Sequence, residues 1–473
     1  MDEMHIQIMN GARMKNRRNK TVRCLILACV LLLSQCPIVS HAWDGNVYSE
    51  AEQPVDIPEI PLYATAAVLM DADSGRVLYG KNQDTAMAMA STTKIMTCIL
   101  VLENVSPEDV LTVSAYAASM PKVKLYIQKG ERYQVRELLY SLMLESHNDS
   151  AVALAEYVGK QYLSEELRGK DTAEYTVEES KQAMAAFALL MNKKAAELGC
   201  ENTWFITPNG LDATEEITLG DGSVLSKEHC TTARELARIM AYCIRESPSR
   251  EAFLEVTRTR SYSFHENGRS FSCVNHNAFL DMMSGALTGK TGFTNKAGYC
   301  YVGALERDGR TFVVALLACG WPNNKNYKWS DTGKLMQYGL ENYSYRSFSE
   351  EGIAFDEGRL GELRVKNGQT SVLGDTAYTK LRIEGREGAN LSNDLAGEWR
   401  EGLLMRTDEQ VKVVYHMEEE LTAPVVPGMT VGTIEYIVEN TVYKKENIIT
   451  ADAIDKIDLE WCMRQVLERF FSL

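Results

Sequence analysis

The fold is decided by the stretch Ala90-Ser-Thr-Thr-Lys-Ile-Met-Thr-Cys-Ile-Leu100. Its apolar second half predicts a helix, and Ser91 stands at the predicted start of that helix, three residues before Lys94. On a helix this spacing places the two side chains on one face, roughly 5–6 Å apart at Cβ. A hydroxyl beside an amine, near the unpaired backbone N–H groups of a helix N-terminus, suggests an activated nucleophile. A plain N-cap serine is the alternative, so the pair needs support from elsewhere in the chain.

A second Ser-x-x-Lys occurs at Ser119-Met-Pro-Lys122. Its internal proline argues against a shared helical face. We therefore expect Ser119 to be chemically inert.

The composition indicates a soluble globular protein of two or three domains. The chain has 473 residues, of which 45% are hydrophobic and 24% charged, and its formal net charge is −15. A nucleic-acid-binding protein would need a basic surface, so we expect no nucleic-acid partner. The eight cysteines beyond residue 42 show no Cys-x-x-Cys spacing, and a chain of this size requires no disulfide.

The first 42 residues have the pattern of a secretory signal peptide. Six basic residues between Arg13 and Arg23 precede the apolar stretch 24–33, and Ser40 and Ala42 fit cleavage after Ala42. The apolar stretch is short for a membrane span, and a retained signal anchor is the alternative. We therefore expect an exported protein. Residues 43–60, which are acidic and contain proline, are expected to form a linker.

The rest of the chain predicts an α+β fold. Strand patterns on both sides of a helical region predict an antiparallel sheet covered by helices over residues 61–346. Residues 162–181 are expected to be an irregular surface insertion, and 212–227 a polar loop. Short strands with glycine turns predict a small all-β domain over 350–450. Residues 452–473 predict an amphipathic helix that either lies on a membrane surface or packs against protein.

Two further motifs stand where polar side chains can face a cleft. Ser146-His-Asn148 falls in a break between two predicted helices, and Thr288-Gly-Lys-Thr-Gly-Phe-Thr294 lies between predicted strands. Taken alone, the first of these is an ordinary helix-start signal. The occurrence of all three motifs in order, each in a suitable setting, favours a shared function.

Together the motifs resemble those of the serine penicillin-recognising enzymes: Ser91-x-x-Lys94, Ser146-x-Asn148 and Lys290-Thr291-Gly292. Within that superfamily, residues 60–345 are similar to the D-alanyl-D-alanine carboxypeptidases, the low-molecular-mass penicillin-binding proteins. The stretch Thr203-Trp-Phe-Ile-Thr-Pro-Asn-Gly-Leu-Asp-Ala213 supports this likeness, and the β-rich tail and final helix match the family's usual domain order.

The resemblance implies a β-lactamase/transpeptidase-like catalytic domain without a cofactor or metal. It implies removal of the terminal D-alanine from peptidoglycan stem peptides through an acyl-enzyme, with β-lactams as covalent inhibitors. It also places the protein at the cell wall or the outer face of the cytoplasmic membrane. His147, His229 and His276 have no metal-ligand spacing, which agrees with a metal-free mechanism.

By the same resemblance, Ser91, Lys94 and Ser146 would be the catalytic residues. Ser91 would be acylated, Lys94 would be its base, and Ser146 would relay a proton to the leaving D-alanine. A free lysine has a pKa near ~10.4, so a base at neutral pH needs a drop of roughly three units. Burial and the cation of Lys290 would supply that drop.

The remaining motif residues would bind the substrate. Asn148 would orient the substrate amide, and Lys290 and Thr291, followed by Gly292, would hold the terminal carboxylate. The backbone N–H groups of Ser91 and Phe293 would form the oxyanion hole.

Two other functions compete with this one. A β-lactamase would share the motifs, but the extra β-rich domain and the lack of a Glu-x-x-x-Asn signature after Ser146 argue against it. A non-catalytic wall-binding or penicillin-sensing protein would not need the full set of motif residues. His147 replaces the small residue that is common at this place and is expected to narrow the cleft.

Overall fold

The computed structural model describes residues 59–218, 223–348, 360–385 and 402–471. The predicted signal peptide and nearly all of the predicted linker lie outside these residues. Within the described ranges, no helix combines the length and apolar character that crossing a bilayer would require.

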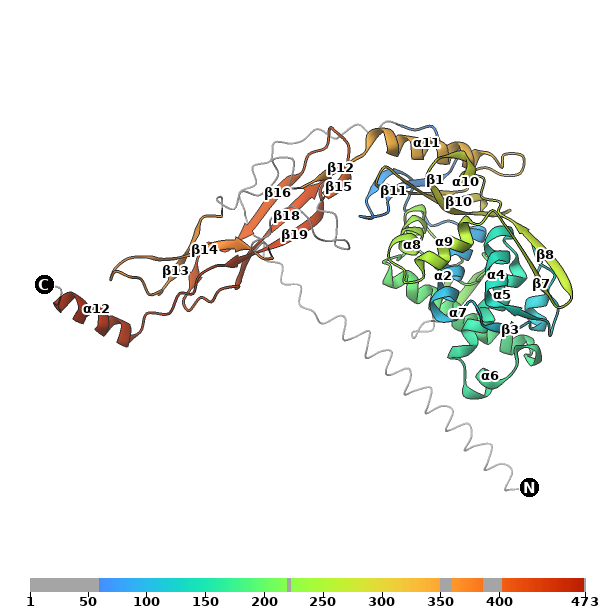
Figure 1. Cartoon of the computed structure of the whole chain (residues 1–473), viewed down its shortest axis with the longest axis horizontal. Helices are drawn as coiled ribbons and strands as arrows, with labels where there is room; N and C mark the ends of the chain where they lie inside the picture. The colour runs from blue at the N-terminus through green and yellow to red at the C-terminus, as the bar shows by residue number, and fades with distance from the viewer. Residues whose placement is uncertain (1–58, 219–222, 349–359, 386–401, 472–473) are drawn as a thin grey trace, which may run out of the picture. The chain divides into compact units, whose positions relative to one another are not determined.

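A five-stranded antiparallel sheet is the framework of the first domain (Figure 1). Its strand order is β2-β1-β11-β10-β9, which places β9, the strand with the third motif, at an edge. The strands are β1 (Ala66–Asp71), β2 (Val77–Lys81), β9 (Ala286–Thr294), β10 (Gly298–Arg307) and β11 (Arg310–Leu317). The side chains of β1 and β11 are buried almost without interruption, which shows that both faces of the sheet are covered.

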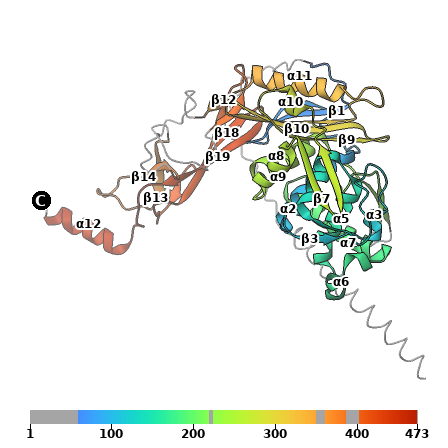
Figure 2. The same ribbon diagram turned by 45° about the vertical axis from the view of Figure 1, so that its right-hand side comes forward.

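Helices cover both faces of this sheet, as the views in Figures 1 and 2 agree. Helix α11 (Tyr327–Asn342) lies on one face, and α8 (Ala233–Arg245) and α9 (Arg250–Arg258) lie on the other. Beyond α8 and α9 is a helical region formed by α2 (Lys94–Asn104), α3 (Ala115–Ala118), α4 (Val135–Tyr140), α5 (Asn148–Gly159), α6 (Glu165–Gly169) and α7 (Val177–Glu197). The predicted α+β class is confirmed.

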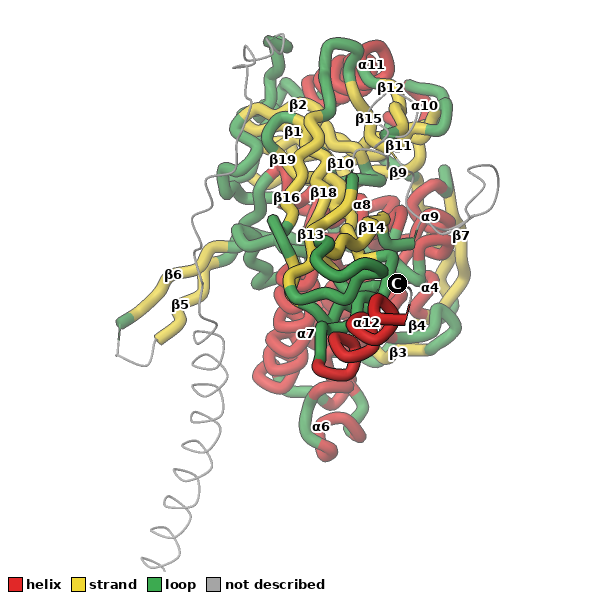
Figure 3. Tube along the Cα trace, turned by 90° about the vertical axis from the view of Figure 1, so that its left-hand side faces the viewer, coloured by secondary structure: helices red, strands yellow, loops and turns green. Residues whose placement is uncertain are grey.

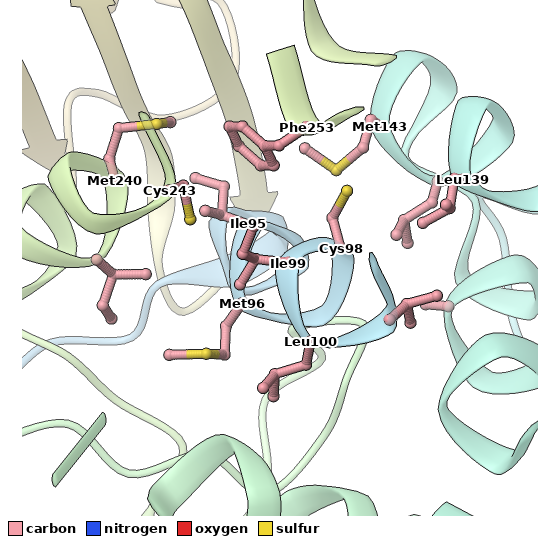
Figure 4. Packing of buried hydrophobic residues seen from close by; sticks show 14 of the residues in the cluster. Ile95, Met96, Cys98, Ile99, Leu100, Leu139, Met143, Met240, Cys243 and Phe253 are labelled. Atoms are coloured by element: carbon pink, nitrogen blue, oxygen red, sulfur yellow. The ribbon is translucent and has the colours of Figure 1, made fainter. Parts of the chain in front are cut away.

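Helix α2 is buried over its first eight residues, from Lys94 to Val101. Figure 4 shows its apolar side chains packed against residues of α8, α9 and the α4 region. The labelled residues are Ile95, Met96, Cys98, Ile99, Leu100, Leu139, Met143, Met240, Cys243 and Phe253. A helix packed on all sides has little freedom to shift, so the motif at its start is held in a fixed place.

Short hairpins extend the first domain. These are β3 (Val110–Thr112) with β4 (Arg132–Gln134), β5 (Thr214–Thr218) with β6 (Val224–Glu228), and β7 (Ser261–Glu266) with β8 (Arg269–Val274). The helix α10 (Phe279–Met282) precedes β9. The β5–β6 hairpin projects from the body of the domain (Figure 3), so the prediction of a polar loop at 212–227 was wrong.

The C-terminal region carries its own sheet and core. Six strands have the order β16-β18-β19-β14-β13-β17. They are β13 (Glu362–Lys366), β14 (Ala377–Ile383), β16 (Lys412–Met417), β17 (Leu421–Thr422), β18 (Thr430–Val438) and β19 (Thr441–Thr450). A separate pair joins β12 (Ser344–Ser347) to β15 (Gly402–Met405), and the final helix is α12 (Leu459–Phe471).

A buried ion pair connects the first hairpin to the segment that follows β15. The Arg76 guanidinium donates to Glu409 through Nη1 at 3.0 Å and Nη2 at 2.6 Å, and Nη1 also donates to the Leu404 carbonyl oxygen at 2.7 Å. Both charged side chains are 1% exposed. Leu404 itself packs in the apolar cluster beneath α11, so this segment is fixed to the five-stranded sheet.

Candidate active site

Ser91 lies in a short 3₁₀ turn, Ala90–Thr93, that leads directly into α2. The α-helix therefore begins at Lys94, one turn later than the sequence predicts. The contact expected from the Ser-x-x-Lys spacing is nevertheless present, since Lys94 Nζ donates to Ser91 Oγ at 2.9 Å. The serine hydroxyl thus has an amine as its immediate neighbour.

Lys94 is fully buried and has no carboxylate as a hydrogen-bond partner among the described residues. Its Nζ also donates to Asn148 Oδ1 at 2.9 Å and to the Asn209 carbonyl oxygen at 2.5 Å. Loss of water on burial, together with repulsion from the Lys290 cation, holds the pKa of Lys94 well below its usual value. A lowered pKa favours the neutral amine, which is the form that can accept a proton.

Ser146 is held between the second and third motifs. It follows the π-helical turn η2 (Ser141–Glu145) and has φ 67° and ψ 30°, a left-handed conformation that costs a non-glycine residue roughly 1–2 kcal/mol. Lys290 Nζ donates to Ser146 Oγ at 2.9 Å and to the Thr291 carbonyl oxygen at 2.8 Å. Burial lowers the pKa of Lys290 to about 7. The contacts from Lys94 to Asn148 and from Lys290 to Ser146 bring all three motifs together.

Asn148 is the first residue of α5, and its surroundings fix it from two sides. Its backbone N–H donates to the Val123 carbonyl oxygen at 2.8 Å. The next residue, Asp149, is buried, and its carboxylate accepts the backbone N–H groups of Leu125, Tyr126 and Ile127. Asp149 was not predicted as a site residue, although an aspartate that directly follows the motif at the start of a predicted helix is a visible signal.

Two glycines allow the Ser91 turn to sit against its neighbours. A Cβ at Gly292 would lie 2.9 Å from the Ser91 backbone nitrogen, so only glycine lets the turn approach strand β9 so closely. A Cβ at Gly210, whose φ is +81°, would lie 2.0 Å from the Ala90 carbonyl oxygen. Gly292 was predicted as a site residue, whereas Gly210 was seen only as part of a supporting stretch.

Strand β9 presents the remaining predicted residues at the edge of the sheet. Thr291 pairs with Tyr301 of β10, and Phe293, which is 38% exposed, pairs with Tyr299. One side of β9 has no partner strand within the described residues, so its backbone can pair with an extended peptide.

Three histidines surround the site without forming a metal cluster. Buried His229 lies 2.8 Å from Thr93 Oγ1 through Nε2, and burial lowers the pKa of His229 to about 4, so its ring is neutral. His276 pairs with Glu145 at 2.8 Å, and His147 contacts Ser141. Across the ranges that the structure describes, no three His, Cys, Asp or Glu side chains gather as a metal site would need.

The arrangement brings two hydroxyl groups and two buried amines together at the edge of a sheet. Lys94 donates to Ser91, and Lys290 donates to Ser146. A serine beside a buried amine is a geometry that nucleophilic catalysis uses.

Comparison with known proteins agrees with this chemistry. Residues 50–162 and 179–318 match the D-alanyl-D-alanine carboxypeptidase family, peptidase S11, and residues 406–456 match the C-terminal domain of penicillin-binding protein 5. The chain is 26% identical over 447 residues to D-alanyl-D-alanine carboxypeptidase DacF of Bacillus subtilis, with 92% of this chain and 96% of that protein covered. It is 30% identical to the D-alanyl-D-alanine carboxypeptidase of Streptomyces sp. strain K15, with 59% of this chain and 87% of that protein covered.

Among solved structures, penicillin-binding protein 5 of Haemophilus influenzae has the same fold. Its TM-score is 0.59 at 22% identity, and the alignment covers 85% of this chain and all of that one. The family match alone spans more than half of the present sequence. The chain therefore belongs to the D-alanyl-D-alanine carboxypeptidase family of serine peptidases.

Proposed function

We propose that this D-alanyl-D-alanine carboxypeptidase acts on peptidoglycan stem peptides, with Ser91 as the nucleophile that is acylated. The observation that carries the assignment is the 2.9 Å contact between Ser91 Oγ and the buried Nζ of Lys94. The depressed pKa of Lys94 supports its role as the base. β-Lactams would acylate the same serine.

In the acylation step, the neutral amine of Lys94 takes the hydroxyl proton of Ser91. The freed Oγ attacks the carbonyl carbon of the penultimate D-alanine, and the carbonyl oxygen becomes an oxyanion. The backbone N–H groups of Ser91 and Phe293 would donate to that oxyanion, and removal of one such donor typically costs about 3–4 kcal/mol in other enzymes. Lys290 and Thr291 would bind the terminal carboxylate, and Asn148 would orient the substrate amide.

Breakdown of the intermediate requires a proton on the departing nitrogen. The proton that Lys94 took from Ser91 would pass through the Ser146 hydroxyl to this nitrogen, which returns Lys94 to its neutral form. The Ser146 hydroxyl contacts Lys290, and Asn148, two residues further on, contacts Lys94. The C–N bond then breaks, D-alanine leaves, and an ester to Ser91 remains. Water attacks this ester with Lys94 again as the base, which regenerates the free serine and releases the shortened peptide.

The test is D-alanine release from a peptide that ends in D-Ala-D-Ala. The wild-type chain is expected to release D-alanine and to be labelled by penicillin, and Ser91→Ala should abolish both. Ser119→Ala is the matched control, because Ser119 opens the second Ser-x-x-Lys but is exposed and bonds only its own turn. Penicillin labelling without release of D-alanine would instead favour another β-lactam-recognising activity.

We also propose that helix α12 rests on a membrane surface. Apart from Trp461, its large apolar side chains are exposed, and most lie at helical spacing: Leu459, Met463, Val466, Leu467, Phe470 and Phe471. Export is part of this proposal, with residues 1–42 as the signal, and a mature chain that begins at Trp43 would support it.

Vesicle co-sedimentation checks the role of α12. The mature chain should sediment with phospholipid vesicles, and a chain that lacks residues 452–473 should stay in the supernatant. Glu460→Gln, on the same helix, is a control that should sediment like the wild-type chain. Equal soluble fractions for the full and the shortened chain would reject the membrane contact.

A further inference from the structure

His147, the middle residue of the second motif, forms a side-chain hydrogen bond with the turn that precedes it. Its ring Nδ1 lies 2.8 Å from Ser141 Oγ. Ser141 is fully buried, and the same Oγ lies 2.7 Å from Ser150 Oγ in helix α5. This hydrogen bond therefore links Ser141, the first residue of η2, to His147, the residue that directly follows Ser146.

Ser146 lies in the segment between the two residues that this hydrogen bond joins. Its backbone N–H donates to the Ser141 carbonyl oxygen, and the N–H of His147 approaches the same oxygen at 3.5 Å. A left-handed conformation at a non-glycine residue persists only where the surrounding structure fixes it. The ring contact to Ser141 is the side-chain bond that spans both ends of this strained segment, and in this conformation the Ser146 hydroxyl meets Lys290.

The ring of His147 is half-buried, and this burial lowers its pKa despite the nearby carboxylates of Asp149 and Glu145. A neutral ring adds no positive charge beside Lys94, whose own pKa must stay low. The contact of His147 with Ser141 therefore requires no ion pair, and its contribution is that of one hydrogen bond between a neutral ring and a hydroxyl.

We propose that His147 is a positioning residue for the carboxypeptidase reaction. Acting through Ser141, its ring holds Ser146 in the left-handed conformation that presents the hydroxyl to Lys290. This inference rests on the proposed function, since the step that it serves is the proton transfer through Ser146. His147 itself needs no contact with the substrate in this role.

The experiment measures the second-order rate constant of acylation by a fluorescent penicillin, together with the thermal unfolding temperature. His147→Ala is expected to slow acylation about tenfold, the size of one lost hydrogen bond. His147→Asn should restore the rate to within about threefold, because an amide near the position of Nδ1 can donate or accept. Ser141→Ala should slow acylation to a similar extent, and the His147→Ala/Ser141→Ala pair should be no slower than the slower single variant.

His265→Ala is the matched control, because it removes another histidine–serine contact, 3.0 Å to Ser270, on the exposed β7–β8 hairpin. It should leave the rate unchanged. Acylation of His147→Ala at the wild-type rate would overturn the proposal, even if the variant unfolds at a lower temperature. An acylation rate for His147→Asn as low as that of His147→Ala would also overturn it. So would a double variant His147→Ala/Ser141→Ala whose loss of rate is the product of the two single losses. A wild-type chain that is not acylated at Ser91 would overturn the proposed function and this inference with it.

Discussion

Replacement of Lys94 by arginine is expected to reduce acylation by penicillin about a thousandfold, within the range that general-base residues contribute in other enzymes. Arginine keeps the positive charge and can donate to the same three acceptors, but its guanidinium does not give up its proton in proteins. The variant therefore removes the base and retains the cation. Stopped-flow or gel-based penicillin labelling measures the effect.

The pH dependence provides an independent check on Lys94. In the wild-type chain, acylation should fall as the pH is lowered, because protonation of Lys94 removes the base, and the fall should be centred well below the usual lysine pKa. Lys94→Arg should show a low rate without this fall. Lys160→Arg, a half-buried lysine at the end of α5, serves as the control and should behave like the wild-type chain. A rate for Lys94→Arg within tenfold of wild type would remove Lys94 as the base.

The second large effect is expected at Arg76. Arg76→Met removes the nearest cation of the buried Glu409 carboxylate, which keeps only the Arg406 guanidinium at 4.0 Å and the Arg406 backbone N–H at 2.9 Å. The loss of one member of a buried pair typically destabilises by about 3–5 kcal/mol. Thermal unfolding should therefore occur several degrees lower. The acylation rate of the folded fraction should be unchanged, because Arg76 contacts none of the three motifs in the described structure.

The double variant Arg76→Met/Glu409→Leu separates a lost ion pair from lost packing. Arg406, which also lies 4.0 Å from Glu409, keeps Asp408 as its partner at 2.9 Å in this variant. Since no buried charge is left unpaired, the double variant should recover most of the unfolding temperature. Arg234→Met is the matched control, because its ion pair with Asp84 is largely exposed and should contribute little. A double variant that is as unstable as Arg76→Met would contradict the explanation.

The sequence predicted the contact between Ser91 and Lys94 because this contact is local. One helical turn separates the two residues, so a helical conformation brings their side chains together. The contact of Lys290 with Ser146 spans 144 residues in the chain, and no periodicity encodes it. Only the resemblance to a family indicated that these two motifs share a site. Gly210 was missed as a site residue for the same reason, because its partner at Ala90 is far away in sequence.

The wrong predictions have physical causes as well. The β5–β6 hairpin has no buried face among its described side chains, so the apolar alternation that reveals a half-buried strand is absent. The final helix begins at Leu459, where the Asp458 carboxylate accepts the Trp461 backbone N–H at 2.8 Å. Ile454, which fits the helical period, instead pairs with Val425 in an isolated bridge, a contact between segments far apart in sequence that the period does not reveal.

The burial of both active-site lysines determines how the surrounding medium acts on the enzyme. Lys94 and Lys290 are 0% and 3% exposed, so both amines are largely removed from solvent. Salt weakens interactions between exposed charges, with a screening length of about 8 Å at 0.15 M, but reaches buried pairs far less. We therefore expect the rate of acylation to depend on acidity far more than on salinity.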